Sequence, residues 1–119
     1  MEAPTPKALV VDDDVALRML MRVNLELDGF AVSEAENLAE AREALAGERP
    51  DVVLLDVHLG REDSGTLLHD LRADGVPVAI VTGSADVADY RDIANGVLEK
   101  PFEPASLVDL ARRLARVEP

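Results

Sequence analysis

Short apolar runs alternate along the chain with longer segments in which apolar residues recur at helical spacing. The apolar runs are rich in Val, Leu, Ile and Ala, and each is short enough for one strand. They cover residues 7–11, 30–33, 51–55, 78–81 and 97–99. The segments with helical spacing cover residues 14–27, 37–47, 64–73, 86–93 and 104–117. This alternation predicts an α/β fold, in which a parallel sheet carries helices on both faces.

Local signals support several of these boundaries. Asp14 precedes the first helical segment, and Asn37 with Glu40 three residues later resembles a capping box. Residues 52–55 are all apolar, which is typical of a strand buried on both faces of a parallel sheet.

Length and composition bound the fold further. The 119 residues suit one domain, which we expect to span 1–119 with a core over about 7–117. Because only three residues are aromatic, this core must be built from aliphatic side chains. The absence of cysteine excludes disulfides, thiolate zinc sites and cysteine nucleophiles.

The formal net charge of −12 argues against direct binding to nucleic acid or to anionic membrane surfaces, because both need clustered basic residues. No apolar run approaches the roughly 20 residues of a membrane-spanning helix. The first residues lack the apolar stretch of a signal peptide. We therefore expect a cytoplasmic protein that contacts neither nucleic acid nor membrane.

Polar residues follow four of the predicted strands. In chain order they are Asp12 and Asp13, Asp56, Thr82, and Lys100. Ligand sites of open parallel sheets lie at the carboxyl ends of the strands, so we expect these side chains to converge on one edge. The first acids could simply cap the following helix, a role that we assign to Asp14.

Such a group of side chains suggests phosphoryl chemistry. Crowded carboxylates repel one another, and a bound divalent cation relieves the repulsion. Oxygen-only ligands suit a hard ion such as Mg²⁺. A cation, a lysine and a hydroxyl around one carboxylate would stabilise charge on a transferring phosphoryl group, which the carboxylate can accept as an acyl phosphate.

Four short motifs at these strand ends resemble the receiver domains of two-component response regulators. They are Val10-Val11-Asp12-Asp13-Asp14, Leu54-Leu55-Asp56, Val81-Thr82-Gly83 and Lys100-Pro101-Phe102. Each motif is weak alone, but the four occur in the right order over roughly residues 7–114. The resemblance implies a flavodoxin-like, doubly wound five-stranded parallel sheet with strand order 2-1-3-4-5.

The resemblance also implies a Mg²⁺ site, for which Mn²⁺ would be a substitute metal. Asp13 would bind the cation directly, and Asp12 would assist through water. Asp56 and the backbone carbonyl of His58 would complete the protein ligands.

By the same resemblance, Asp56 would be the phosphoacceptor, with Thr82 and Lys100 bound to the phosphoryl oxygens. A cis peptide is expected before Pro101. The donor would be a phosphohistidine on a sensor histidine kinase or a histidine phosphotransfer protein, and the downstream protein partner is unknown. The domain would switch conformation and partner binding and then dephosphorylate, which makes it a signalling module rather than an enzyme with a separate substrate.

Three departures from the family pattern concern signalling. Gly60 stands where proline is usual, and Val97 stands where an inward-turning Tyr or Phe is usual. Thr82 and Lys100 are 18 residues apart, about four fewer than is typical, so the fourth helix should be short or irregular. These features leave open a degenerate receiver that binds partners without phosphorylation. A small-molecule phosphatase or phosphotransferase is a weaker alternative, because it needs a second acid–base aspartate and a substrate-covering cap.

Overall fold

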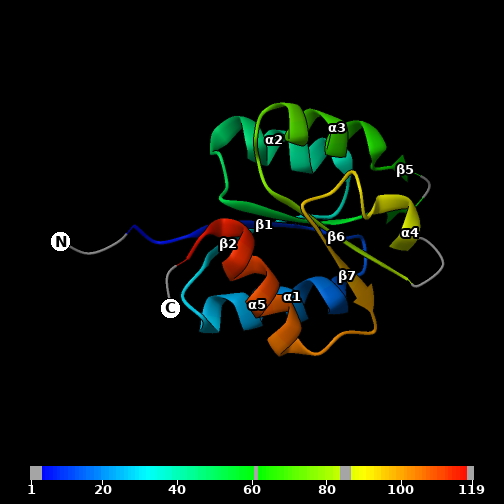
Figure 1. Ribbon diagram of the computed structural model, residues 1–119. Coiled ribbons are helices and arrows are strands. Elements are labelled where there is room, and N and C mark those ends of the chain that lie inside the picture. The colour runs from blue at the N-terminus through cyan, green and yellow to red at the C-terminus, as the bar shows by residue number, and fades with distance from the viewer. Residues whose placement is uncertain (1–3, 61, 84–86, 118–119) are drawn as a thin grey trace.

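A five-stranded parallel sheet forms the centre of the computed structural model, which describes residues 4–60, 62–83 and 87–117 (Figure 1). Its strands are β1 Lys7–Val11, β2 Ala31–Ala35, β3 Val52–Asp56, β6 Val78–Gly83 and β7 Gly96–Lys100. They lie in the order β2-β1-β3-β6-β7, and every neighbouring pair is parallel. The predicted fold class and the order 2-1-3-4-5 are confirmed, because β6 and β7 are the fourth and fifth strands of this sheet.

Helices cover both faces of the sheet, with α1 and α5 on one face and α2 and α3 on the other (Figure 1). Their bounds are α1 Val15–Leu27, α2 Leu38–Gly47, α3 Gly65–Ala73, α4 Val87–Tyr90 and α5 Pro104–Ala115. Each face has its own aliphatic core, because alternate residues of the central strands point to opposite sides of the sheet. Along β3, for example, Val53 and Leu55 pack beneath α2 and α3, whereas Val52 and Leu54 pack beneath α1 and α5.

The predicted helix caps are present. The side chain of Asp14 accepts hydrogen bonds from the backbone N–H groups of Ala16 and Leu17 at the start of α1. Asn37 caps α2 by accepting from the N–H of Glu40, whose carboxylate in turn accepts from the N–H of Glu36. The reciprocal bond therefore reaches one residue further back than in a standard capping box.

Several strand ends differ from the prediction because pairing with a neighbouring strand decides where a strand ends. The second strand begins one residue later than expected and continues to Ala35, paired with β1 through Val11. The third includes Asp56 and the fourth reaches Gly83, which pairs with Lys100 of β7.

The segment after β3 contains a small antiparallel hairpin that the sequence analysis did not predict. Its strands are β4 His58–Leu59 and β5 Glu62–Asp63, and Gly60 in the connecting turn has a φ of +62°. Only glycine adopts this region easily, whereas proline is fixed near −65°. The proline that is usual here in the family is therefore incompatible with this turn.

The fourth helix is short, as expected. Residues 86–93 were predicted to be helical, but α4 spans Val87–Tyr90 and Asp86 lies outside the described residues. A turn follows, in which Ile93 and Ala94 donate backbone hydrogen bonds to the carbonyl of Tyr90. Within the described ranges, no helix is long and apolar enough to cross a membrane.

Gly96 allows close packing of α5 on β7, and its replacement tests this packing. A Cβ at Gly96 would lie 2.8 Å from Leu110 Cδ1 and 3.4 Å from Leu114 Cδ1. We expect Gly96→Ala to lower the free energy of unfolding by about 1 kcal/mol, because the side chain of Leu110 must move within a packed layer. The measurement is urea unfolding followed by circular dichroism. Gly47→Ala is the control, since nothing lies within 4 Å of its Cβ position; equal stability of the two variants would contradict the packing.

Candidate functional site

The register of the sheet brings the predicted site residues to one edge. Val11 of β1 pairs with Leu55 of β3, so Asp12 and Asp56 are at the same level of two adjacent strands. Asp56 pairs with Val81 of β6, which places Thr82 one residue beyond it. Lys100 ends β7 at the level of Gly83.

Three carboxylates lie together at this edge. Oxygen atoms of Asp12, Asp13 and Asp56 all lie within 4.8 Å of one another. Asp12 and Asp56 are buried, whereas Asp13 is exposed to solvent. Two buried acids and one exposed acid therefore form a small cluster of carboxylates that is open to solvent on one side.

Asp56 is held by contacts to both of its carboxylate oxygens. Its Oδ1 accepts a hydrogen bond of 3.1 Å from the backbone N–H of His58. Its Oδ2 lies 3.4 Å from Nζ of Lys100. The ammonium of Lys100 also lies 3.8 Å from Oδ2 of Asp12, so it faces both buried carboxylates.

The buried carboxylate of Asp12 is poorly compensated. Its Oδ1 accepts a hydrogen bond of 2.9 Å from the N–H of Asp14. Its Oδ2 is buried and accepts no hydrogen bond from the described part of the chain. Burial raises the pKa of Asp12 to about 6, and the neighbouring Asp56 carboxylate adds to the increase.

These features fit a hard divalent cation. The buried Oδ2 of Asp12 has no hydrogen-bond donor among the described residues, and one oxygen each of Asp12, Asp13 and Asp56 lies close enough to the others to share a cation. Carboxylate oxygens without nitrogen or sulfur donors are typical of Mg²⁺ sites, which retain several waters on their open side. The metal role of the His58 carbonyl stays a prediction.

The remaining predicted residues lie beside this cluster. Thr82 is 1% exposed, one residue past the strand position that pairs with Asp56. The peptide bond between Lys100 and Pro101 is cis, as expected. Val97 and Tyr90, both partly buried, pack against the core beneath α2 and α3.

Ser64 was predicted only as the start of a helix, but it also supports the site. Its hydroxyl is buried and donates a hydrogen bond of 2.6 Å to the backbone carbonyl of Asp56. The bond ties the end of β3 to the first turn of α3. A serine before a helix usually indicates a cap, so its position gave no signal of this contact across eight residues of chain.

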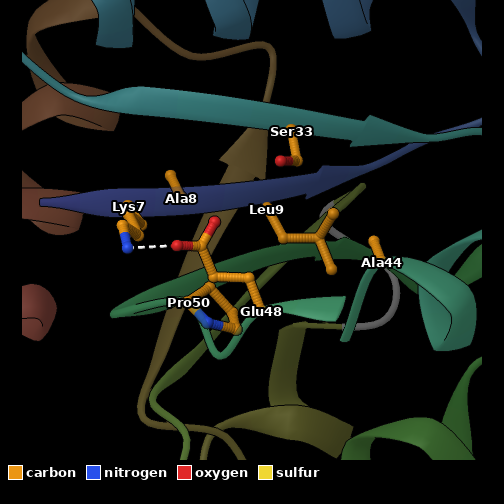
Figure 2. Close-up of a pocket in the computed structure, with 7 residues that line it drawn as sticks. All are labelled: Lys7, Ala8, Leu9, Ser33, Ala44, Glu48 and Pro50. Atoms are coloured by element: carbon orange, nitrogen blue, oxygen red, sulfur yellow. Dashed lines mark hydrogen bonds and ion pairs between the residues drawn. The ribbon is translucent and has the colours of Figure 1, made fainter. Parts of the chain in front are cut away.

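The hollow in Figure 2 is separate from this site. It is lined by residues from β1, β2 and the end of α2, including Lys7, Ser33, Ala44 and Glu48. Lys7 and Glu48 form an ion pair across it (Figure 2). Lys7 begins β1, whereas the acidic cluster follows the other end of that strand, so the hollow takes no part in the chemistry described above.

Comparison with known proteins supplies the family. The sequence profile of the response regulator receiver domain matches residues 8–112. The chain belongs to this family. The receiver domain of NtrX from Brucella abortus is 28% identical, with a TM-score of 0.85 over 93% of this chain and 99% of that one. The chemotaxis response regulator CheY4 of Vibrio cholerae, 24% identical, shares the fold with a TM-score of 0.83 over 93% of this receiver domain and 99% of that chain.

Curated relatives extend beyond this receiver domain. Response regulator MprA of Mycolicibacterium vanbaalenii is 36% identical over 116 residues, which are 92% of this chain and 50% of that protein. MprA of Mycobacterium avium is 35% identical over 116 residues, which are 92% of this chain and 51% of that protein. The receiver domain thus spans about half the length of the curated relatives it matches.

The raised pKa of Asp12 predicts that this acid destabilises the metal-free receiver domain. We expect Asp12→Asn to raise the free energy of unfolding at pH 7.5 in EDTA by about 1–3 kcal/mol, because each unit of pKa shift corresponds to 1.36 kcal/mol. The folded-state pKa of about 6 exceeds the ordinary 3.8. The cost of ionised Asp12 is therefore complete above pH 6 and disappears as the pH falls toward 3.8.

Urea unfolding at pH 7.5 and pH 5 measures this effect. The stability difference between Asp12→Asn and wild type should shrink at the lower pH. Asp109→Asn, at an exposed position of α5, removes the same charge and serves as the control. A loss of stability in Asp12→Asn at pH 7.5, or a gain equal to that of Asp109→Asn, would contradict the assignment.

Proposed function

We propose that this receiver domain takes a phosphoryl group onto Asp56 from a phosphohistidine of a sensor histidine kinase or a histidine phosphotransfer protein. The observation that carries the proposal is the meeting of three carboxylates, a lysine and a threonine at one end of the sheet. The family supports the class of donor, since receiver domains act in two-component systems. No separate substrate is turned over, because the domain itself is the acceptor.

The proposed metal is Mg²⁺, with Mn²⁺ as a substitute. Asp12, Asp13 and Asp56 would hold it, together with the backbone carbonyl of His58. When bound, it supplies positive charge that offsets the charge of the three carboxylates and of the incoming phosphoryl oxygens. Asp13, the exposed member, would hold the cation from the solvent side of the site.

In the transfer step, a carboxylate oxygen of Asp56 attacks the phosphorus atom. A P–O bond forms, the P–N bond to the donor imidazole breaks, and the imidazole keeps the electron pair and takes up a proton. The buried setting of Asp56 and its hydrogen bond from His58 N–H hold the carboxylate in one orientation for this attack. In the dephosphorylation step, water attacks the phosphorus, the P–O bond to Asp56 breaks, and phosphate and the free carboxylate are formed.

Phosphorylation would add a charge of about −1.5 to −2 next to Lys100 and Thr82. Lys100 would move its ammonium from the carboxylates to the phosphoryl oxygens, and the Thr82 hydroxyl would donate a hydrogen bond to them. Lys100 is the last residue of β7 and Thr82 is the next-to-last residue of β6, so their shift would alter the loops that follow and change which partner protein binds. With Val97 in place of the usual aromatic ring, this change would not depend on rotation of a side chain at that position.

Intact-mass measurement tests the proposal. The protein is incubated with acetyl phosphate or phosphoramidate, with Mg²⁺ or with EDTA. We expect the mass of one phosphoryl group to be added only with Mg²⁺, and to be removed by neutral hydroxylamine, which cleaves acyl phosphates. Asp56→Asn should lose the adduct completely, whereas Asp109→Asn, with its acid on the exposed side of α5, should keep it.

Two results would overturn the proposal. One is an adduct that persists in Asp56→Asn. The other is the absence of any adduct in wild type, together with no change in thermal stability when beryllofluoride and Mg²⁺ are added. The second result would favour a domain that binds its partners without phosphorylation.

A further inference from the structure

Arg18 of α1 contacts the backbone of the acidic loop. Its Nη1 donates a hydrogen bond of 2.7 Å to the carbonyl oxygen of Asp12. Its Nε donates at 2.9 Å to Oε1 of Glu34, near the end of β2. The Arg18 side chain is only 14% exposed, so both contacts are partly shielded from water.

Glu34 is itself held from a second side. Its Oε2 accepts a hydrogen bond of 2.6 Å from Nη1 of Arg22, one turn further along α1. Arg22 also pairs with Glu26 at 3.1 Å. Glu34 therefore bridges two guanidinium groups of the same helix, which restricts the orientations open to Arg18.

The carbonyl that Arg18 holds belongs to the peptide unit between Asp12 and Asp13. On the other side of Asp12, its backbone N–H donates at 3.0 Å to the carbonyl of Ala35 in β2. Asp12 is thus fixed by β2 on one side and by Arg18 on the other. The plane of the peptide between Asp12 and Asp13 helps to set the direction in which the Asp13 side chain projects from the backbone.

We propose that Arg18, anchored by Glu34, is a positioning residue that orients the peptide between Asp12 and Asp13 and so prepares the cation site. The inference rests on the proposed Mg²⁺ site and deepens it, because it assigns a role to residues outside the four sequence motifs. Arg18 touches neither the cation nor the phosphoryl group. Its role is to hold a backbone group from which a ligand projects.

The sign of the effect separates positioning from charge. Removal of a positive charge near a cation site should, by charge alone, strengthen Mg²⁺ binding. Loss of the support for Asp13 should weaken it. Lysine at position 18 keeps the charge but cannot reproduce the two donors with which the guanidinium reaches Asp12 and Glu34 at once.

The test is the Mg²⁺ affinity of the whole chain, measured by calorimetry at fixed pH and ionic strength. We expect Arg18→Gln and Arg18→Lys each to weaken Mg²⁺ binding about tenfold, as is typical when a residue that orients a metal ligand is lost. Arg22→Gln is the matched control: it removes a positive charge and a partner of Glu34 but leaves the contact to Asp12. Its Mg²⁺ affinity should stay within about twofold of wild type.

A metal-free measurement checks the same role. In EDTA, the backbone N–H of Asp14, which donates to Asp12 Oδ1, should exchange with solvent faster in Arg18→Lys than in wild type or Arg22→Gln. If wild type binds Mg²⁺ and both Arg18 variants bind it equally or more tightly, the role of Arg18 is overturned but the proposed cation site stands. Equal weakening in Arg22→Gln would overturn the role of Arg18 also. No Mg²⁺ binding by wild type would instead overturn the proposed site itself.

Discussion

The properties of the site follow from the repulsion between carboxylates that the parallel sheet brings together. Asp12 and Asp56 are buried at the same level of adjacent strands, and Asp13 lies beside them. The ammonium of Lys100 faces both buried acids at 3.4 Å from Asp56 and 3.8 Å from Asp12, too distant for strong hydrogen bonds. Burial raises the pKa of Asp12 to about 6. The proposed divalent cation would offset this excess of negative charge and so stabilise the folded domain.

The cluster of carboxylates costs stability, and the surrounding fold both holds it in place and offsets that cost. Aliphatic layers on both faces of β3 keep Asp56 at a fixed depth, and Ser64 ties its carbonyl to α3. Asp14 caps α1 with its side chain while its backbone N–H donates to Asp12, so the helix start and the acidic loop form one unit. Stabilising packing elsewhere offsets the cost at the site, as is common at functional centres.

Much of this could be predicted from the sequence because it follows from local patterns. Apolar runs with intervening helical periodicity gave the order of elements, and the polar residues that follow the strands gave Asp12, Asp56, Thr82 and Lys100. The hairpin of β4 and β5 was not predicted, because strands of two residues carry no periodicity. The contacts of Ser64 and Arg18 with backbone carbonyls were not predicted either. They depend on how the helices and strands pack together, and no residue spacing in the sequence indicates them.

Stability as a function of Mg²⁺ concentration tests the central claim most directly. A cation that binds the folded chain at this cluster must stabilise it by RT ln(1 + [Mg²⁺]/Kd), about 2.7 kcal/mol at a hundredfold excess over Kd. The free energy of unfolding of wild type should therefore rise with Mg²⁺ at pH 7.5 and constant ionic strength. The rise should be largely lost in Asp13→Asn. A wild-type free energy of unfolding that does not change with Mg²⁺, or that rises equally in Asp13→Asn, would show that the carboxylate cluster does not hold the cation.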